Sequence, residues 1–433
     1  MTASTHALPD RSIPPASLPV RNLIVTQAEI GNLNNGMPVY SVNAGFQDLI
    51  RVEFLFENRR FRPELAALTA AANRLLSEGT TRHSALQLAE MIDDVGAFLE
   101  TEESADNCSV VLYTLNKHLA STLPIVKEML TLAVFPESEV GVYRKKQQQR
   151  LAVENERVNS IARRKFNQLL FGSSNPYGYM VESTDFDRLD TAILQEYHQS
   201  QYHSGNCVLL LAGKIHDSTL PLLNQHFGGN DWQQPAPSQP VFGEIVSDAS
   251  KIHFLHKEGA LQSAIRIGRR MMTRAHEDYP GLSVLNTVLG GYFGSRLMSN
   301  IREDKGYTYG IGSALVSLKR EGYFFISTEV GADVTSAALA EIYKEIEILQ
   351  HELVPKEELY MVRNYMLGSF LKGIDGPFAL LDRFKTLQLS GLDYSYFERY
   401  LLKLETIGSE EIRDLARKYF KKEDLYELVV GVK

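Results

Sequence analysis

The feature that most constrains the fold of this chain is an internal repeat. Residues 194–213 (LQEYHQSQYHSGNCVLLLAG) and residues 412–431 (IRDLARKYFKKEDLYELVVG) share the same order of polar, aromatic and apolar positions. Tyr202 aligns with Phe420 and Gly213 with Gly431, and both pairs are 218 positions apart (420 − 202 and 431 − 213). Because 218 is close to half of the 433 residues, the repeat predicts two similar domains.

A polar, proline-rich stretch divides the two repeats. It runs from Gly228 to Ser247 and contains Pro235, Pro237 and Pro240. Such composition is typical of a linker. We therefore predict an N-terminal domain over residues 1–230, a linker over 231–248 and a C-terminal domain over 249–433.

The order of the expected elements is similar in the two halves. Residues 48–56 (DLIRVEFLF) alternate like a strand with one buried face, and they precede a run of helical patterns. Strands followed by helices favour an α+β fold, in which helices pack on a mostly antiparallel sheet. We expect strands over 48–56, 108–115, 262–267, 308–316 and 322–330, and helices over 64–76, 84–98, 117–135, 138–171, 281–289, 295–302, 333–349 and 356–372.

Charge and hydropathy exclude two classes of partner. The chain has 45 basic and 53 acidic residues, a net charge of −8, which argues against nucleic acid as a partner. No apolar run approaches the roughly 18 residues of a membrane span, so no membrane is expected. The N-terminus lacks the basic and apolar regions of a signal peptide, which predicts a cytoplasmic location, or a periplasmic one if a leader has been removed.

Histidines and cysteines do not form a metal motif in this sequence. None of the eleven histidines has HExxH or HxxEH spacing. His198 and His203 are five positions apart, and His253 and His256 would point to opposite faces of a strand. Cys108 and Cys207 lie in strand-like runs and are expected to be buried free thiols. We therefore expect no cofactor and no metal in this chain.

Two adjacent strings in the second half carry a family resemblance. Residues 289–297 (LGGYFGSRL) and 301–309 (IREDKGYTY) resemble the pitrilysin/insulinase family of zinc metallopeptidases. Two further strings agree, Gln262-Ser263 and residues 175–178 (NPYG). The resemblance covers nearly the whole chain and implies the duplicated α+β fold of that family.

The resemblance also implies that the first half has lost its zinc site. Family members carry HxxEH shortly before a Gly-Thr pair, which corresponds to residues 79–80 here. Ala70 then replaces the first histidine, Asn73 the catalytic glutamate and Arg74 the second histidine. Alanine and a guanidinium cannot ligate zinc. The third ligand would lie near Glu154 or Glu156, and one carboxylate alone does not hold the metal.

The second half retains another family feature. Family peptidases place an arginine and a tyrosine, seven positions apart, opposite the zinc, and Arg302 and Tyr309 match that spacing. By resemblance, Tyr309 would donate its phenol proton to the scissile carbonyl oxygen, and Arg302 would hold the peptide backbone or orient Tyr309. The structural alternative is that Arg302 pairs on its helix while Tyr309 packs in a strand.

A retained Arg/Tyr pair without a zinc motif implies a partner chain. The family contains bacterial and mitochondrial heterodimers in which one subunit carries zinc and the other the Arg/Tyr pair. We therefore predict a non-catalytic, substrate-binding subunit of a zinc metalloendopeptidase, with a homologous HxxEH-bearing partner that binds the zinc. Its substrates would be peptides or unfolded segments. Two alternatives remain: a structural subunit with no role in proteolysis, and a stand-alone peptide-binding protein.

Overall fold

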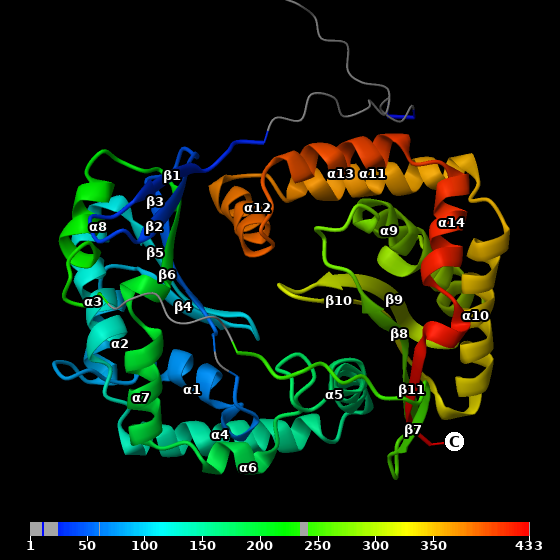
Figure 1. Ribbon diagram of the computed structural model, residues 1–433, viewed down its shortest axis with the longest axis horizontal. Helices are drawn as coiled ribbons and strands as arrows, with labels where there is room; N and C mark the ends of the chain where they lie inside the picture. The colour runs from blue at the N-terminus through cyan, green and yellow to red at the C-terminus, as the bar shows by residue number, and fades with distance from the viewer. Residues whose placement is uncertain (1–10, 13–24, 60, 234–240, 433) are drawn as a thin grey trace, which may run out of the picture.

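The computed structural model describes residues 11–12, 25–59, 61–233 and 241–432. Two β-sheets with surrounding helices form its two halves, as Figure 1 shows. Pro235, Pro237 and Pro240 of the expected linker lie outside the described residues. No described helix is long and apolar enough to cross a membrane.

The first half contains a six-stranded sheet in the order β1-β2-β6-β3-β5-β4. Only β2 and β6 pair in parallel; the other neighbours are antiparallel. The strands are β1 Glu29–Asn32, β2 Pro38–Asn43, β3 Leu49–Glu57, β4 Phe98–Glu103, β5 Asn107–Leu115 and β6 Cys207–Gly213. The helices are α1 Leu68–Arg74, α2 Ala85–Asp93, α3 Leu119–Leu132, α4 Glu137–Glu154, α5 Val158–Phe171, α6 Ser183–Asp187, α7 Thr191–Gln201 and α8 Thr219–Phe227.

The second half contains a five-stranded sheet in the order β7-β11-β8-β10-β9. Again one pair, β7 and β11, is parallel. The strands are β7 Ile252–His256, β8 Gln262–Met271, β9 Thr308–Ser317, β10 Gly322–Gly331 and β11 Tyr426–Gly431. The helices are α9 Tyr279–Asn286, α10 Thr335–His351, α11 Lys356–Lys372, α12 Pro377–Leu389, α13 Ser395–Thr406 and α14 Ser409–Tyr419.

The two sheets have one topology, as the internal repeat predicts. Without β1, the order β2-β6-β3-β5-β4 corresponds strand by strand to β7-β11-β8-β10-β9. The repeated segment forms a helix followed by a central strand in both halves, α7 with β6 and α14 with β11. The predicted α+β architecture of two mostly antiparallel sheets packed with helices is therefore confirmed.

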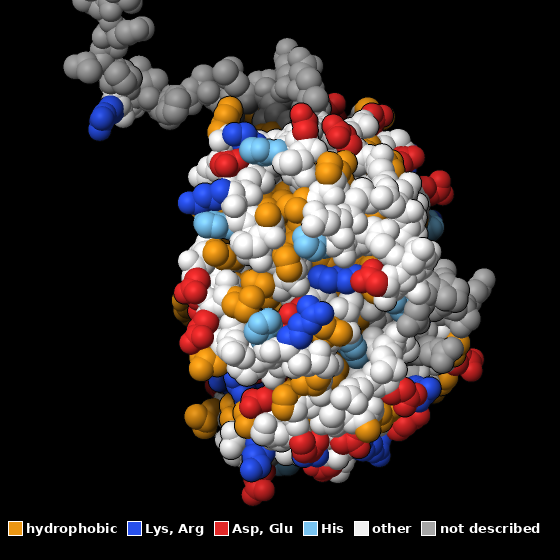
Figure 2. All heavy atoms as spheres, turned by 90° about the vertical axis from the view of Figure 1, so that its left-hand side faces the viewer, with side chains coloured by type: hydrophobic (Ala, Val, Ile, Leu, Met, Phe, Trp, Pro, Cys, Tyr) orange, Lys and Arg blue, Asp and Glu red, His pale blue; other side chains and the backbone are white. Residues whose placement is uncertain are grey.

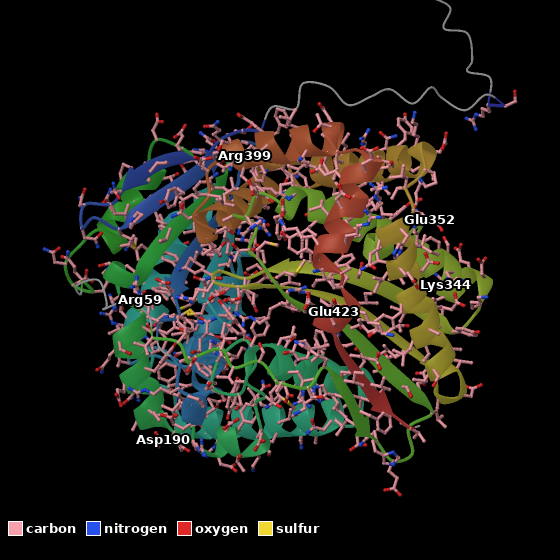
Figure 3. The ribbon with its side chains drawn as sticks, turned by 45° about the vertical axis from the view of Figure 1, so that its right-hand side comes forward. Arg59, Asp190, Lys344, Glu352, Arg399 and Glu423 are labelled. Carbon is pink, nitrogen blue, oxygen red and sulfur yellow. The ribbon has the colours of Figure 1, made fainter. Side chains whose placement is uncertain are left out.

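Alternation along the strands separates a core face from a second face in each sheet. In β10 every second residue is buried, including Phe324 and Ile326, and these side chains pack with α9, α10 and α14. In β3, Phe54 and Phe56 are fully buried toward α1 and α7. Each such side chain contributes about 1.5–3 kcal/mol relative to exposure. Outside the second sheet, α10 directs Lys344 to the surface, as Figure 3 shows.

The second face of each sheet is covered by a helix from the opposite half. Helix α5 of the first half places Ala162 and Phe166 against Ala264 and Leu428 of the second sheet. Helix α12 of the second half places Leu381 in a cluster with Val42 and Leu210 of the first sheet. The helices begin at Val158 and Pro377, 219 positions apart (377 − 158), so this exchange follows the internal repeat.

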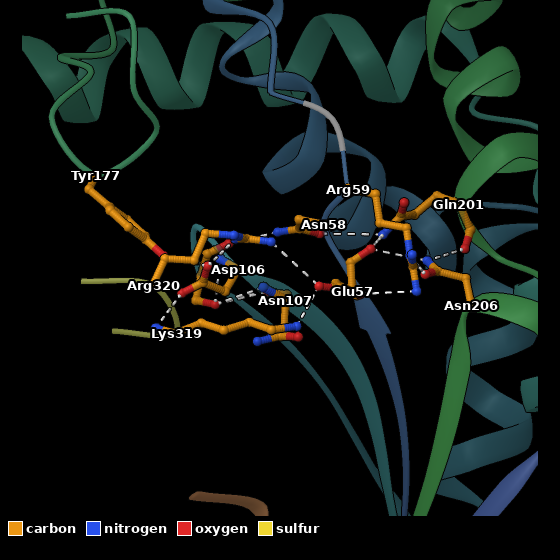
Figure 4. Close-up of polar contacts among 11 residues, drawn as sticks. Glu57, Asn58, Arg59, Asp106, Asn107, Tyr177, Gln201, Asn206, Lys319 and Arg320 are labelled. Atoms are coloured by element: carbon orange, nitrogen blue, oxygen red, sulfur yellow. Dashed lines mark hydrogen bonds and ion pairs between the residues drawn. The ribbon is translucent and has the colours of Figure 1, made fainter. Parts of the chain in front are cut away.

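Polar contacts also join the halves at the turn between β9 and β10, as Figure 4 shows. Lys319 pairs with Glu57, and Arg320 pairs with Asp106 at 3.0 Å. Asp106 is buried and also accepts a hydrogen bond of 2.6 Å from Tyr177. Tyr177 belongs to the 175–178 string, so part of the family resemblance lies at this junction.

Some elements differ from the predictions. Phe98 begins strand β4 instead of ending a helix, because Phe98–Glu103 pairs with β5 as an edge strand. The helix expected over 138–171 is two helices, α4 and α5, separated at residues 155–157 where the chain turns to the second sheet. The helices expected over 281–289 and 295–302 continue as π-helical turns, Thr287–Gly291 and Met298–Asp304.

Candidate functional site

Arg302 and Tyr309 lie together on the second half. The Arg302 guanidinium carbon is 5.4 Å from the centroid of the Tyr309 ring and 4.8 Å from that of Phe293. These are cation–π distances. Tyr309 is 92% exposed and Phe293 61%, so Tyr309 does not pack in the sheet as the structural alternative requires. The side chain that sequence analysis did not single out, Phe293, lies inside the resembling string.

Two π-helical turns bring this pair together. Arg302 lies in the turn Met298–Asp304, and Thr287–Gly291 precedes it. π-helical turns are rare and occur often at functional sites. Gly306, with φ of 66°, lets the chain reverse into β9, where Tyr309 follows Thr308. The pairing of β9 with β10 shifts register here, since Thr308 pairs with Val330 and Ile311 with Thr328.

Close packing holds the first π-helical turn against β9. A Cβ atom on Gly290 would lie 2.6 Å from the Ser313 hydroxyl and 2.7 Å from the Ser313 backbone nitrogen. No side chain fits in that space, which explains a glycine in the string 289–297. The register of β9 beneath Arg302 therefore depends on Gly290.

A bidentate ion pair fixes the segment to α11. Arg296 donates to both carboxylate oxygens of Glu358, at 2.9 and 2.8 Å, and its side chain is 15% exposed. The two parallel hydrogen bonds favour a single orientation. Sequence analysis named no role for Arg296; its only signal was its place inside the string 289–297.

The half-buried Arg302 and the exposed Tyr309 present hydrogen-bond donors to a ligand. A phenol provides one O–H and a guanidinium provides five N–H groups in a fixed plane. Such donors can hold the carbonyl oxygens of an extended peptide and stabilise negative charge that develops on one of them. The pair alone provides neither a nucleophile nor a metal.

The three degenerate motif positions lie on α1 in the first half. Asn73 is fully buried, and its amide nitrogen donates to the carbonyl oxygens of Glu102 at 2.8 Å and Ser109 at 3.2 Å. Its amide oxygen accepts from the Tyr202 hydroxyl at 3.1 Å. Asn73 therefore joins α1 to the edge of the sheet and to the end of α7. Ala70 is half-buried and Arg74 is exposed.

These positions do not fit zinc. Ala70 has no ligand atom, the amide of Asn73 is used within the protein, and Arg74 brings a positive charge. Glu154 accepts from Arg150 at 3.2 Å, and Glu156 pairs with Lys257 at 2.8 Å. Within the described residues, no group of three His, Cys, Asp or Glu side chains could hold a metal ion.

A cavity of about 700 Å³ opens beside α1 at these positions. Ala70, Arg74 and Glu154 line it, together with charged side chains from α4 and α5. Every lining residue lies between positions 66 and 186, so Arg302 and Tyr309 are not part of it. The structure thus brings Arg302 to Tyr309, and Ala70 to Arg74 and Glu154, at two different places.

The buried thiols and histidines are core residues. Cys108 and Cys207 are buried and free, as expected, and burial raises the pKa of the Cys108 thiol to about 11. His198 packs between Phe135 and Tyr202, and burial lowers its pKa to about 4. Figure 2 shows the outer face of the first half, where charged side chains of both signs and small apolar areas alternate.

Comparison with known proteins shows what this chain is similar to. Residues 188–366 match the peptidase M16 inactive domain, a range that includes Arg302 and Tyr309. The uncharacterized zinc protease YmxG of Bacillus subtilis (strain 168) is 22% identical over 376 residues, 86% of this chain and 90% of the relative.

Two solved structures have the same fold. A peptidase M16 inactive domain from Pseudomonas fluorescens has a TM-score of 0.84 at 18% identity, covering 94% of this chain and 98% of that chain. A protease from Helicobacter pylori has a TM-score of 0.84 at 17% identity, covering 94% and 100%. The chain is thus similar to the peptidase M16 inactive domain in sequence over residues 188–366 and in fold over nearly its whole length, and its positions 70, 73 and 74 do not fit zinc.

Proposed function

We propose that this protein is the non-catalytic, substrate-binding subunit of a heterodimeric zinc metalloendopeptidase. The proposal rests on one observation: the chain keeps an Arg/Tyr pair but has no residues that could hold zinc at positions 70 and 74. Arg302, on a π-helical turn, lies beside the exposed Tyr309 of β9, while Ala70 and Arg74 cannot hold zinc. In a chain without a zinc site, this pair can assist peptide hydrolysis only if a second subunit provides the metal.

In this proposal the partner is a homologous chain with HxxEH, and the two subunits enclose the peptide between them. Tyr309 donates its phenol proton in a hydrogen bond to the carbonyl oxygen of the scissile bond, which gains negative charge as the bond is attacked. Arg302 stacks on the Tyr309 ring and so restricts its orientation. Loss of one such donor typically lowers the rate about 10²–10³-fold.

The first test is isolation of the protein from its native cells under gentle conditions, with mass spectrometry of the proteins that remain bound. We expect a near-stoichiometric partner that carries HxxEH. Recovery of the protein alone, or only with proteins that are not peptidases, would overturn the proposal and favour a structural or stand-alone binding role.

The second test uses the reconstituted complex and a Tyr309→Phe variant. The change removes one hydroxyl and keeps the ring over Arg302, so we expect kcat to fall about 10²-fold or more with KM little changed. Tyr360→Phe is a matched control, because Tyr360 is also exposed but lies on α11. Equal activity of the Tyr309→Phe and wild-type complexes would contradict the oxyanion role.

A further inference from the structure

The cavity at the degenerate motif has the size and the walls of a ligand site. Its volume of about 700 Å³ lies within the usual range for small-ligand pockets. Helices α1 and α4 form two of its walls, and small side chains at Ala66, Ala67 and Ala70 leave the space open. Its charged and phenolic lining residues are Arg74, Glu78, Glu103, Glu139, Tyr143, Lys146, Arg150, Glu154, Arg163, Arg164 and Tyr179.

Arg74 places its positive charge in this cavity without a direct contact to a carboxylate among the described residues. Among the residues that the structure describes, its guanidinium makes neither an ion pair nor a hydrogen bond. Glu78 and Glu103 act on it only as more distant charges. An arginine in a cavity without a bound carboxylate has its full set of planar donors available to a ligand.

A second donor points to the same kind of ligand. Tyr143 of α4 is 8% exposed and lines the cavity, yet its hydroxyl makes no hydrogen bond within the described residues. Burial raises the pKa of Tyr143 to about 12, so the hydroxyl stays protonated and can donate. The hydroxyl oxygen is not one of the buried side-chain atoms without a partner among the described residues, so it is open to the cavity and can donate to a ligand there.

The charge balance favours an anion over a cation. The lining has five basic and four acidic side chains, and Arg150 and Glu154 already pair with each other at 3.2 Å. One added carboxylate would balance the remaining positive charge and pair with Arg74.

We propose that this cavity binds a carboxylate group of a peptide, with Arg74 as its ion-pair partner and the Tyr143 hydroxyl as a hydrogen-bond donor. The zinc site of the family is thus replaced by a binding site for a negative group. The carboxylate chemistry rests on the cavity itself, whereas the choice of a peptide as its carrier rests on the proposed function. The carboxylate can be the peptide's C-terminus or an acidic side chain.

The test measures peptide affinity of the full chain, without any partner, by fluorescence anisotropy. Three octapeptides of glycine and serine, each labelled at the N-terminus with an uncharged BODIPY dye, serve as probes: one with a free C-terminus, one amidated, and one amidated with a central glutamate. We expect one or both charged peptides to bind at least tenfold more tightly than the neutral peptide. Which of the two does so identifies the C-terminus or the side chain as the source.

Single-residue variants test whether the preference for charged peptides depends on the cavity. Arg74→Gln should abolish the preference for the charged peptide, and Tyr143→Phe should weaken its binding about three- to tenfold. Lys145→Gln is the matched control, because Lys145 is exposed on α4, does not line the cavity and gives the same change in charge. Circular dichroism and thermal melting verify that each variant is folded.

Three results would overturn the site: equal affinity of the wild-type protein for all three probes, an undiminished preference in folded Arg74→Gln, or the same loss in Lys145→Gln. The outcome for this site is independent of the outcome for the proposed function. Tyr309→Phe should keep the carboxylate preference, and a protein that is purified without a peptidase partner should keep it too.

Discussion

At the scale of single residues, the buried side chain of Asn73 shows how a polar group is accommodated inside the first half. Asn73, which the family resemblance aligns with a catalytic glutamate, forms hydrogen bonds with two backbone carbonyls and the Tyr202 hydroxyl. A glutamate there could not donate to those carbonyls. Asn73 thus makes hydrogen bonds that hold α1 in place and that a glutamate could not make in full.

His198 gives the stability of the protein a pH dependence. Its pKa is lowered from 6.5 to about 4 in the folded state because burial disfavours the imidazolium. The unfolded state therefore binds the extra proton between pH 6.5 and 4, and stability falls as the pH falls through that range. The shift corresponds to about 3 kcal/mol.

We therefore expect His198→Phe, which keeps a ring between Phe135 and Tyr202, to lose less stability than the wild-type protein between pH 7 and pH 4. Urea denaturation at a series of pH values measures the difference. Parallel profiles for the two proteins would show that His198 does not titrate as a buried group.

At the scale of elements, the strings that carry the family resemblance are also where local helix geometry is unusual. Apolar periodicity identified the helices around 281–302 correctly as helical, because the backbone continues to coil there. It could not show that the two turns are π-helical, and it could not show that Gly290 of the first turn packs closely against Ser313 in β9. The pairing of Arg302 with Tyr309 was predicted from the spacing within a known pattern, not from periodicity.

Gly290→Ala tests this packing. The added methyl group would approach Ser313 and Leu297 within 3 Å, so we expect a loss of about 1–3 kcal/mol in the free energy of unfolding. In the reconstituted complex we expect a lower kcat, because Tyr309 lies on the displaced strand. Gly368→Ala on α11 is the control, since nothing lies within 4 Å of its Cβ position and alanine favours the helix. Equal stability of Gly290→Ala and wild type would contradict the close approach.

Other elements had weaker signals. Strand β4 is an edge strand with mostly exposed charged side chains, so its alternation is faint. The break between α4 and α5 at residues 155–157 has neither proline nor glycine. The chain separates the two helices there because α5 packs on the distant sheet, a contact between residues 158–171 and 264–430 that no local pattern contains. For the same reason the cavity at Arg74 could not be foreseen from the sequence.

At the scale of the whole molecule, ion pairs connect the two halves. The β9–β10 turn of the second half reaches Glu57 and the buried Asp106 of the first. A second group lies between β3 and α12, where the fully buried Glu53 pairs with Arg51 at 2.6 Å and with Lys385. Buried carboxylates that lose their cations are costly, so these contacts couple the stability of the halves.

Combined Lys319→Ala and Arg320→Ala substitutions should lower the free energy of unfolding by roughly 1–3 kcal/mol. The effect is limited because the two cations are about 30% exposed and partly screened. Urea denaturation gives the free energy, and high salt should reduce the difference from wild type. Lys344→Ala removes a surface pair on α10 and should change stability by less than about 0.5 kcal/mol. A double variant as stable as Lys344→Ala would show that the turn does not couple the halves.

The exchange of α5 and α12 has a consequence for how such a chain could arise. A gene for one half alone would encode a sheet whose second face stays bare, because its covering helix lies over the other sheet. Such an ancestor could bury both faces only as a homodimer whose two copies swapped this helix. Duplication and fusion of that gene would make the swap intramolecular, and either half expressed by itself should then dimerise or aggregate.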